Sequence, residues 1–284
     1  MESNNKSKIK FLSEKKNNQK NTILISHRLR GFDDHDATRI GLMNAILSGI
    51  KYIEIDLRIT KDKQIVINHD PHLKEHFNSS EFISKLTLDE IKNIHYKNSD
   101  SNESILTLQE LLDLFNQYKK NDSFLFLDIK EYGLEENIIS EIINRNLLNN
   151  IIIISWLPEV LFKIHSINPD IKLCFSFIPV LHQLKYFLLK FSFDKIHFNK
   201  FISLLSKLFS IKITSYFEYT NFIFNNYNRN ELDKYKLEDY AGKDYEHIIN
   251  DWLNKNLLSI LQKSKGMICV PYKLIDKNFV DKNH

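Results

Sequence analysis

The chain has 284 residues, which is enough for one large domain or two small ones. Hydrophobic residues make up 43% and charged residues 26% of the sequence, as in ordinary folded proteins with a sizeable core. The net charge of +3 is too small to indicate that nucleic acid is the main partner.

Composition divides the chain into four parts. Residues 1–21 are mostly polar and contain no apolar signal segment, which predicts a disordered polar tail. Residues 22–178 alternate between strand and helix patterns and form the first part of the predicted main domain. A helical insertion is expected over 179–265, and residues 266–284 are expected to form a later strand and the start of a helix.

Strand and helix patterns alternate regularly in the main domain. Apolar runs predict strands over residues 21–26, 51–59, 64–68, 124–129, 151–154, 171–175 and 266–272. Helices are expected over residues 37–48, after Thr87, after Thr107, over 134–147 and from Pro158. This alternation is typical of a parallel sheet, which occurs in doubly wound folds and in α/β barrels. Polar side chains at the strand ends favour a TIM (β/α)8-type barrel, incomplete or irregular at its C-terminal end.

Several helix starts are recognisable in the sequence. The helix over 37–48 is expected to be capped by Asp36 or Thr38. Its predicted apolar stripe consists of Ile40, Met43, Ile46 and Leu47. Two later helices begin with the capping-box pattern, formed by Thr87 with Glu90 and Thr107 with Glu110.

The two cysteines, Cys174 and Cys269, are far apart and outside any metal-ligand spacing. We expect both to be small buried residues of a protein in a reducing compartment. No stretch is apolar enough to span a bilayer, so the expected location is cytoplasmic. Residues 181–213 are rich in Phe, Leu and Lys, which indicates either peripheral contact with an anionic membrane or, as we favour, helices packed on the main domain.

Glu54 and Asp56 form the sharpest chemical pattern. Side chains two residues apart in a strand share a face, so both carboxylates point the same way. Each would cost on the order of several kcal/mol when buried, unless it is paired or bound to a metal. Two interpretations stay open: a divalent cation with oxygen ligands, or an ion pair with Arg28, Arg58 or Lys130.

Asp128 and Lys130 repeat this pattern on a later strand. Asp128 is a candidate third metal ligand, and Lys130 is a candidate phosphate contact. An internal Asp–Lys pair is the alternative interpretation.

His27 ends the first predicted strand and His69 ends the returning hairpin strand. Hydrolysis of a phosphodiester needs a base for the attacking group and an acid for the leaving alkoxide, and histidine titrates near neutral pH. Arg28 offers a planar fork that suits a phosphate group. A structural role for either histidine is the alternative interpretation.

Taken together, these residues resemble the glycerophosphodiester phosphodiesterase family over about residues 22–130, and more weakly to about 178. The resemblance depends on the order and spacing of His27-Arg28, Thr38, Gly49, Glu54-Ile55-Asp56, Thr60-Lys61-Asp62, Ile65-Val66-Ile67, His69-Asp70, the two capping boxes and Asp128-Ile129-Lys130. It implies a TIM barrel that uses Ca²⁺ or Mg²⁺ to release glycerol 3-phosphate and an alcohol. The implied roles are acid and base for His27 and His69, phosphate contacts for Arg28 and Lys130, and metal ligands for Glu54, Asp56 and Asp128.

The sequence departs from the family pattern at several positions. Leu29 replaces a glycine after His-Arg, so the tight turn is expected at Gly31. Ala37 replaces an asparagine, and Asp128 is one methylene shorter than the usual glutamate. The family's later Trp-Thr-x-Asn strand and final strand are missing, which indicates a divergent member truncated at its C-terminal end.

Three functional hypotheses follow from the resemblance and its departures. The first is a metal-dependent hydrolase of glycerophosphodiesters or lysophospholipids. The second is a lipid phosphodiesterase that forms a cyclic phosphate by intramolecular attack. The third, from a different class, is an inactive remnant or a membrane-surface binding module. Nucleic acid is not an expected partner.

Overall fold

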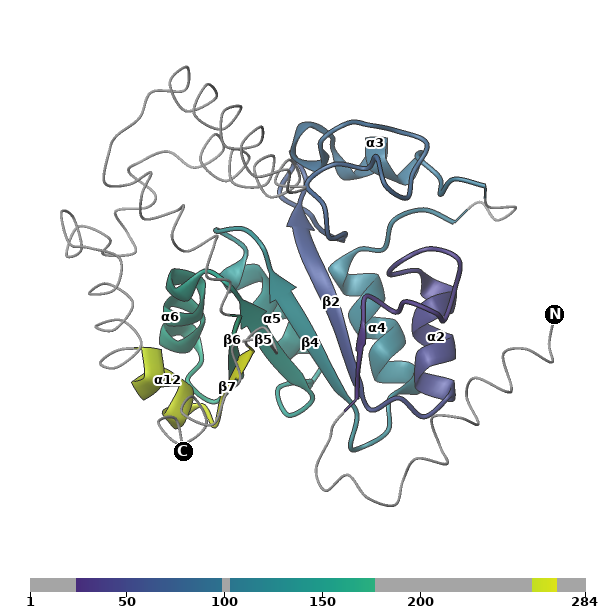
Figure 1. The fold of residues 1–284 in the computed structure, drawn as a ribbon. Helices are drawn as coiled ribbons and strands as arrows, with labels where there is room; N and C mark the ends of the chain where they lie inside the picture. The colour runs from purple at the N-terminus through teal and green to yellow at the C-terminus, as the bar shows by residue number, and fades with distance from the viewer. Residues whose placement is uncertain (1–23, 99–102, 177–256, 270–284) are drawn as a thin grey trace, which may run out of the picture.

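A computed structural model describes residues 24–98, 103–176 and 257–269 of the chain (Figure 1). The predicted polar tail, the basic segment 181–213, most of the predicted insertion and the helix expected near the C-terminus lie outside these residues. We therefore describe the part of the molecule that contains the predicted site.

The described residues form alternating strands and helices. The strands are β1 (Ile25–His27), β2 (Tyr52–Ile59), β3 (Ile65–Ile67), β4 (Phe124–Ile129), β5 (Ile151–Ser155), β6 (Lys172–Ser176) and β7 (Met267–Cys269). The helices are α2 (Arg39–Leu47), the 3-10 turn η1 (Ile83–Lys85), α3 (Leu88–Lys92), α4 (Leu108–Tyr118), α5 (Glu135–Asn144), α6 (Pro158–Ile167) and α12 (Leu258–Lys263). Every strand predicted within these residues is present, with boundaries shifted by a few residues.

Six of these strands form a parallel sheet in the order β1-β2-β4-β5-β6-β7. The seventh strand, β3, returns antiparallel to the end of β2. The sheet curls, and helices α2, α4, α5 and α6 cover its outer side (Figure 1). This is the architecture of a TIM-type α/β barrel, and β7 is its sixth parallel strand, as predicted. Within the described residues the barrel stays open between β1 and β7.

The two faces of the sheet differ because side chains alternate along each strand. The outer face packs on the helices through one large apolar cluster, to which β2 contributes Ile53, Ile55 and Leu57. The inner face has a smaller apolar cluster of Phe126, Ile152, Ile154 and Cys174. Glu54, Asp56 and Asp128 lie on this inner face, and Asp128 is next to the last residue of β4.

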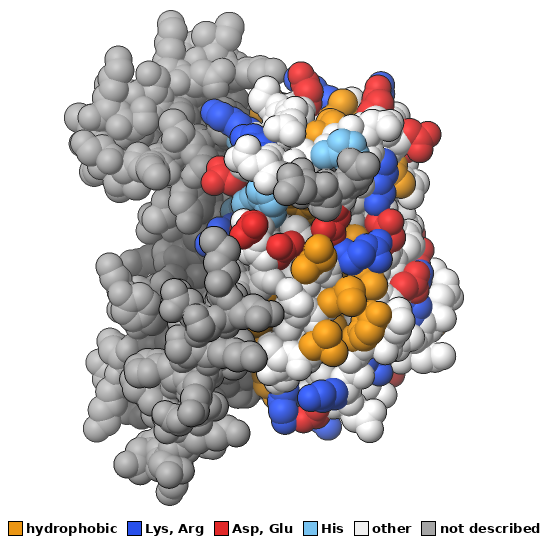
Figure 2. Space-filling model, turned by 90° about the vertical axis from the view of Figure 1, so that its right-hand side faces the viewer, with side chains coloured by type: hydrophobic (Ala, Val, Ile, Leu, Met, Phe, Trp, Pro, Cys, Tyr) orange, Lys and Arg blue, Asp and Glu red, His pale blue; other side chains and the backbone are white. Residues whose placement is uncertain are grey.

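Helix capping agrees with the sequence, but the buried face of α2 does not. Thr38 caps α2, and both predicted capping boxes are formed at Thr87 and Thr107. The predicted stripe on α2 is wrong at Ile40 and Leu47, which are 47% and 68% exposed. Ile46 is buried as predicted, and Gly41, Leu42 and Ala45 are buried with it. Apolar residues surround this helix, so the sequence alone does not select a face. Figure 2 shows apolar side chains gathered on the side of the molecule that includes α2.

The connection between β3 and α4 packs as a small unit beside the sheet. It contains η1, α3 and its own apolar cluster, formed by Val66, Leu73, Phe77, Ile83, Ile91, Tyr96 and Ile105. The ring of His35 stacks on Tyr96 with centroids 5.0 Å apart, and its Nε2 lies 2.6 Å from the Lys97 carbonyl oxygen. These contacts join the unit to the loop before α2.

The cysteines behave differently from each other. Cys174 is buried as expected, whereas Cys269 is exposed, so the second prediction is wrong. Cys269 ends β7, which has a neighbouring strand on one side only within the described residues. No helix in this part of the chain is long and apolar enough to cross a membrane.

Candidate active site

Three carboxylates from two neighbouring strands meet on the inner face. Glu54 and Asp56 lie on β2, and Asp128 on β4 is the register partner of Asp56. One oxygen of each lies within 4.8 Å of the other two. The residues are 6%, 2% and 7% exposed. The parallel register therefore brings together the three carboxylates that the sequence predicted as one group.

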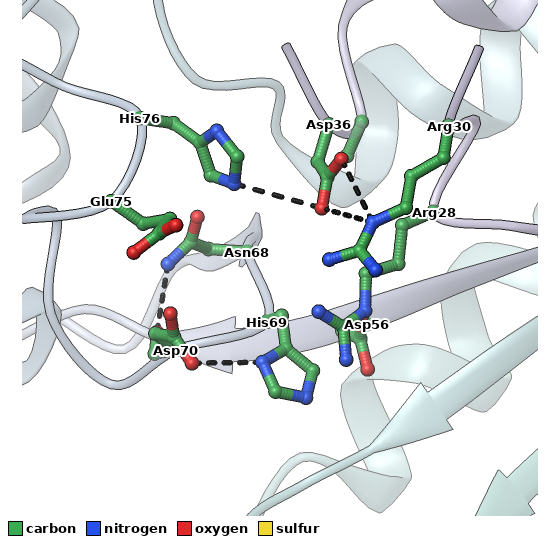
Figure 3. A pocket seen from close by; sticks show the side chains of 10 residues that line it. Arg28, Arg30, Asp36, Asp56, Asn68, His69, Asp70, Glu75 and His76 are labelled. Carbon is green, nitrogen blue, oxygen red and sulfur yellow. Dashed lines mark hydrogen bonds and ion pairs between the residues drawn. The ribbon is translucent and has the colours of Figure 1, made fainter. Parts of the chain in front are cut away.

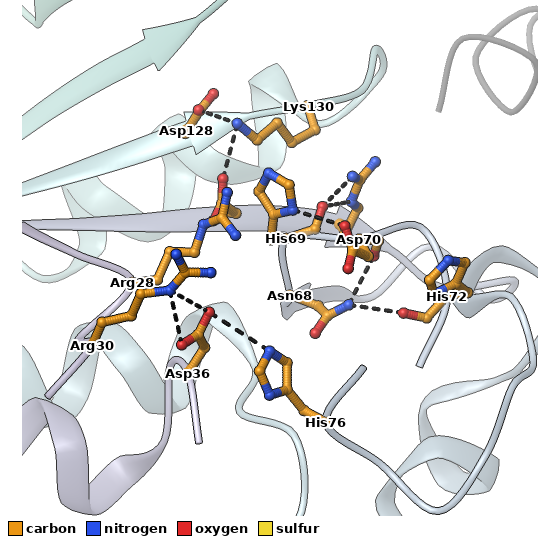
Figure 4. Close-up of polar contacts among 12 residues, drawn as sticks. Arg28, Arg30, Asp36, Asn68, His69, Asp70, His72, His76, Asp128 and Lys130 are labelled. Carbon is orange, nitrogen blue, oxygen red and sulfur yellow. Dashed lines mark hydrogen bonds and ion pairs between the residues drawn. The ribbon is translucent and has the colours of Figure 1, made fainter. Parts of the chain in front are cut away.

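Two cationic side chains contact this cluster. The Nε atom of Arg28 lies 3.2 Å from Oδ2 of Asp56, and Nζ of Lys130 lies 2.9 Å from Oδ1 of the same carboxylate. Lys130 also pairs with Asp128 (Figure 4). The sequence left open Arg28, Arg58 and Lys130 as ion-pair partners of the carboxylates on β2. Arg28 and Lys130 form such pairs, both with Asp56. Two cations facing three carboxylates leave one negative charge in the cluster when all three acids are ionised.

The electrostatics of the cluster favour a further cation. Burial, reinforced by the neighbouring Asp56 and Asp128, raises the pKa of Glu54 well above its ordinary value. Burial also raises the pKa of Asp128, although Lys130 opposes the shift. Burial opposes ionisation of Asp56 too, but Lys130, His69 and Arg28 hold its pKa below the usual range.

Unpaired oxygens indicate where such a cation fits. Among the described residues, neither oxygen of Glu54 nor Oδ1 of Asp128 has a hydrogen-bond donor. Buried carboxylate oxygens without donors are the ligands that hard divalent cations prefer. The three carboxylates therefore fit a site for a hard divalent cation, and the ion pairs with Arg28 and Lys130 lie beside this site.

His27 approaches the cluster from β1, where its register partner is Glu54. Its Nε2 lies 3.5 Å from Oε2 of Glu54, and its side chain is 56% exposed. Partial burial, followed by the charge of Arg28, lowers the pKa of His27 to about 4. The ring is therefore neutral at pH 7 and able to accept a proton.

His69 reaches the same carboxylates through the β2–β3 hairpin. The backbone N–H of Asn68 donates to the Asp56 carbonyl at 3.1 Å, which brings the end of β3 back beside Asp56. Nδ1 of His69 lies 2.8 Å from Oδ1 of Asp70. Burial lowers the pKa of His69, while Asp70 opposes the shift. A neutral ring that donates from Nδ1 to Asp70 presents Nε2 as a proton acceptor.

A pocket of about 380 Å³ opens beside the cluster (Figure 3). Its lining includes three predicted site residues, Arg28, Asp56 and His69. No role in a site was predicted for the other lining residues, which are Arg30, Asp36, Ala37, Asn68, Asp70, Glu75 and His76. Of these, only Asp70 could have been predicted from the sequence, because it directly follows the candidate His69. The others come from separate loops, and no sequence spacing predicts their meeting.

Asp36 organises the outer part of this pocket. Its carboxylate lies 3.1 Å from Nε of Arg30 and 3.6 Å from Nε2 of His76. Burial opposes ionisation, but these two partners lower the pKa of Asp36. Glu75 has no ion pair with any described residue, and Figure 3 shows its carboxylate beside Asn68.

Comparison with known proteins agrees with this geometry. Residues 30–186, more than half of the chain, match the Glycerophosphoryl diester phosphodiesterase family. The chain belongs to this family. A glycerophosphodiester phosphodiesterase of Caldanaerobacter subterraneus subsp. tengcongensis is 28% identical over 161 residues, covering 54% of this chain and 65% of the relative. One from Bacillus altitudinis is 26% identical, covering 57% and 69%.

One solved structure similar to this chain is that of a phosphodiesterase of Oleispira antarctica in complex with the product sn-glycerol-3-phosphate. It is 25% identical, with a TM-score of 0.48, and the match covers 59% of this chain and 70% of that one. The chain thus matches between about two thirds and 70% of the length of these relatives.

This family member makes the turn after His27 in an unexpected way. Gly31 has a positive φ of 85°, but Arg28 and Leu29 are also left-handed, with φ of 57° and 61°. Gly31 therefore has the conformation expected of it, and Arg28 and Leu29 also take part in the turn. Leu29 is fully buried in the large apolar cluster. Its packing offsets the cost of a backbone conformation that favours glycine.

The other two departures from the glycerophosphodiester phosphodiesterase pattern are accommodated in the site. Ala37 also has a positive φ, 57°, and lines the pocket where the family pattern has asparagine. Asp128, although shorter than the family's glutamate, reaches the other two carboxylates.

Proposed function

We propose that this chain is a metal-dependent phosphodiester hydrolase that converts glycerophosphodiesters to glycerol 3-phosphate and an alcohol. The observation that best supports the proposal is the meeting of Glu54, Asp56 and Asp128 on one face, next to a pocket with two arginines and two histidines. Family membership supports the same substrate class. Lysophospholipids contain the same glycerophosphate diester, and we include them as substrates.

Each residue has a role that follows from its chemistry. Glu54, Asp56 and Asp128 would hold Ca²⁺ or Mg²⁺, which when bound would polarise the phosphoryl group as a Lewis acid and orient the diester. Arg28 projects beside Asp56 and would bind a phosphate oxygen through its planar guanidinium. Lys130, which contacts two of the three carboxylates, would balance their charge and contact the phosphate.

The two histidines would transfer the protons. His69 is oriented by Asp70 and lines the pocket, so its Nε2 is suited to accept a proton from one reacting oxygen. His27, on the opposite side of Glu54 from β4, would serve the other oxygen. Both rings are neutral at pH 7, so one ring accepts the proton of the attacking oxygen and later returns it to solvent. The other ring first takes up a proton from solvent, which it then donates to the leaving alkoxide.

Hydrolysis of glycerophosphocholine by the full chain tests the proposal. Turnover is measured with Mg²⁺ or Ca²⁺, and ³¹P NMR identifies the product. We expect glycerol 3-phosphate, loss of turnover in excess chelator, and recovery when the cation is restored. A cyclic phosphate product would instead support intramolecular attack, and no turnover with any divalent cation would support an inactive chain.

A matched pair of carboxylate variants tests the metal cluster. Glu54→Gln keeps the shape of a buried ligand and removes its charge, so we expect loss of turnover. Asp122→Asn is the control, because Asp122 pairs with Lys51 at the surface near the opposite ends of β2 and β4. Turnover that survives both chelation and Glu54→Gln would contradict metal dependence.

A further inference from the structure

A buried ion pair lies beside the candidate active site and has no part in the proposed chemistry. Arg58 is on β2, two residues beyond Asp56, and Glu131 directly follows Lys130. The two side chains are 0% and 1% exposed, and Nη1 of Arg58 lies 3.0 Å from Oε1 of Glu131. The sequence left open Arg28, Arg58 or Lys130 as the ion-pair partner of Glu54 and Asp56, and Arg58 pairs with Glu131 instead.

The same guanidinium also binds the backbone of His69. Nε of Arg58 donates to the His69 carbonyl oxygen at 2.9 Å, and Nη2 donates to that oxygen as well. Arg58 therefore attaches His69 to β2, the strand that bears Glu54 and Asp56. Three of its guanidinium donor atoms are used by two partners, which fixes the plane of the group.

Other contacts fix the chain on both sides of this carbonyl. The backbone N–H of Asn68 donates to Asp56, and its side-chain amide donates to the carbonyl oxygens of Asp70 and His72 at 2.7 and 3.2 Å (Figure 4). The ring of His69 is in turn held by Asp70. Arg58 donates to the backbone carbonyl oxygen of His69 itself.

Stability is a weak explanation for such a pair. Removing two ions from water is costly, and replacing a buried ion pair with apolar side chains of similar volume is often neutral or stabilising. Positioning is a better explanation, because a displacement of about 1 Å at a reacting group can lower a rate by about 100-fold. The guanidinium of Arg58 fixes the position of His69 relative to Glu54 and Asp56, because these two carboxylates lie on the same strand, β2, as Arg58.

We infer that Arg58 is a positioning residue for His69 and that Glu131 holds the Arg58 guanidinium in the orientation this requires. The inference rests on the proposed function, because it assigns His69 a reacting role. It goes beyond that function in naming two residues that touch neither the substrate nor the cation.

The central test replaces the whole pair with apolar residues, Arg58→Met together with Glu131→Leu. We expect the variant to fold with a free energy of unfolding equal to or above that of the wild type. Its kcat for glycerophosphocholine should fall by about 10- to 100-fold with KM changed less than about twofold. A folded double variant with wild-type kcat would overturn the inference.

Two single variants keep the test decisive if the double variant does not fold. Arg58→Lys retains the charge but loses the planar fork, so we expect kcat between those of the wild type and the double variant. Glu131→Gln retains an acceptor for Nη1 and leaves both bonds to His69, so kcat should stay within about threefold of the wild type. If Arg58→Lys matched the wild type in kcat, positioning by this pair would be contradicted, whereas a larger loss in Glu131→Gln would show that Glu131 must be charged to hold the guanidinium.

A control and a readout independent of turnover separate this inference from the proposed function. Arg145→Met breaks an ion pair with Asp113 and Glu141, none of which lines the pocket, and should leave kcat unchanged. Hydrogen exchange of residues 68–73 should be faster in Arg58→Lys than in the wild type, with exchange in β4 unchanged. Absence of wild-type turnover would refute the proposed function, whereas unchanged exchange and unchanged kcat would refute only the positioning role.

Discussion

The Nδ1 atom of His69 lies 2.8 Å from Oδ1 of Asp70, the next residue in the chain. Both side chains are about one-third exposed and line the pocket. A carboxylate that accepts from Nδ1 selects the tautomer in which Nε2 is free to accept a proton. Asp70 thus gives the His69 ring a defined orientation and protonation state.

The first prediction concerns this pair. His69→Ala should lower kcat by at least about 100-fold, because the proton acceptor is removed. Asp70→Asn should lower kcat by about 10-fold or more, because an amide can stabilise the wrong tautomer of the ring. Steady-state kinetics with glycerophosphocholine measure both effects. An Asp70→Asn variant with wild-type kcat would show that Asp70 does not orient the ring.

The second prediction concerns the carboxylate cluster without metal. Burial beside Asp56 and Asp128 disfavours the charged form of Glu54, so Glu54→Gln, which cannot ionise, should raise the thermal midpoint in chelator. The wild type should gain about 2.7 kcal/mol of stability when the cation is present at 100 times its Kd. Glu54→Gln should lose most of this gain. Thermal melts with and without Ca²⁺ or Mg²⁺ measure both changes, and an undiminished metal-induced shift in the variant would contradict the site.

The third prediction concerns the left-handed Leu29. A glycine there would relieve about 1–2 kcal/mol of backbone strain, but losing a fully buried leucine costs about 2–5 kcal/mol. Leu29→Gly should therefore lower the free energy of unfolding by about 1–3 kcal/mol. Urea unfolding measures the change. A more stable Leu29→Gly protein would mean that packing does not compensate for the strained turn.

The fourth prediction is a pH dependence at the start of α4. Glu110 accepts from the backbone N–H of Thr107 at 2.8 Å and from Nζ of Lys92 at 2.6 Å. Burial opposes ionisation, but these bonds lower the pKa of Glu110 below its ordinary value. Its contribution to stability is therefore present above the pKa of an unfolded glutamate and is lost as pH falls through the lower, folded-state pKa.

Comparison of Glu110→Gln with the wild type measures this contribution. The wild type should be the more stable protein at pH 7, and the difference should shrink as pH falls below about 4. Thr107→Ala, which removes the capping hydroxyl, should cost about 1 kcal/mol at pH 7. A stability difference between Glu110→Gln and the wild type that grows in acid would contradict the assignment.

Local patterns in the sequence predicted much of the fold. The capping boxes at Thr87 and Thr107 depend on residues three positions apart, and both are formed. The strand from Phe124 to Ile129 is apolar enough to be recognised by itself. The buried face of α2 was predicted wrongly because its choice depends on what the helix packs against. The same limit applies to Leu29, because the cost of its left-handed conformation is offset by packing against residues distant in the sequence.

The sequence by itself determined which residues could do chemistry: two carboxylates share a face of β2, a third stands on β4, and a histidine ends each of two strands. Strand periodicity is a local property, so these facts can be read from spacing. Only the tertiary structure decided that Asp56 and Asp128 are register partners, that Arg58 turns to Glu131 and His69, and that Asp36, Glu75 and His76 line one pocket. Such meetings depend on strand register and loop packing between distant residues, which no short-range pattern specifies.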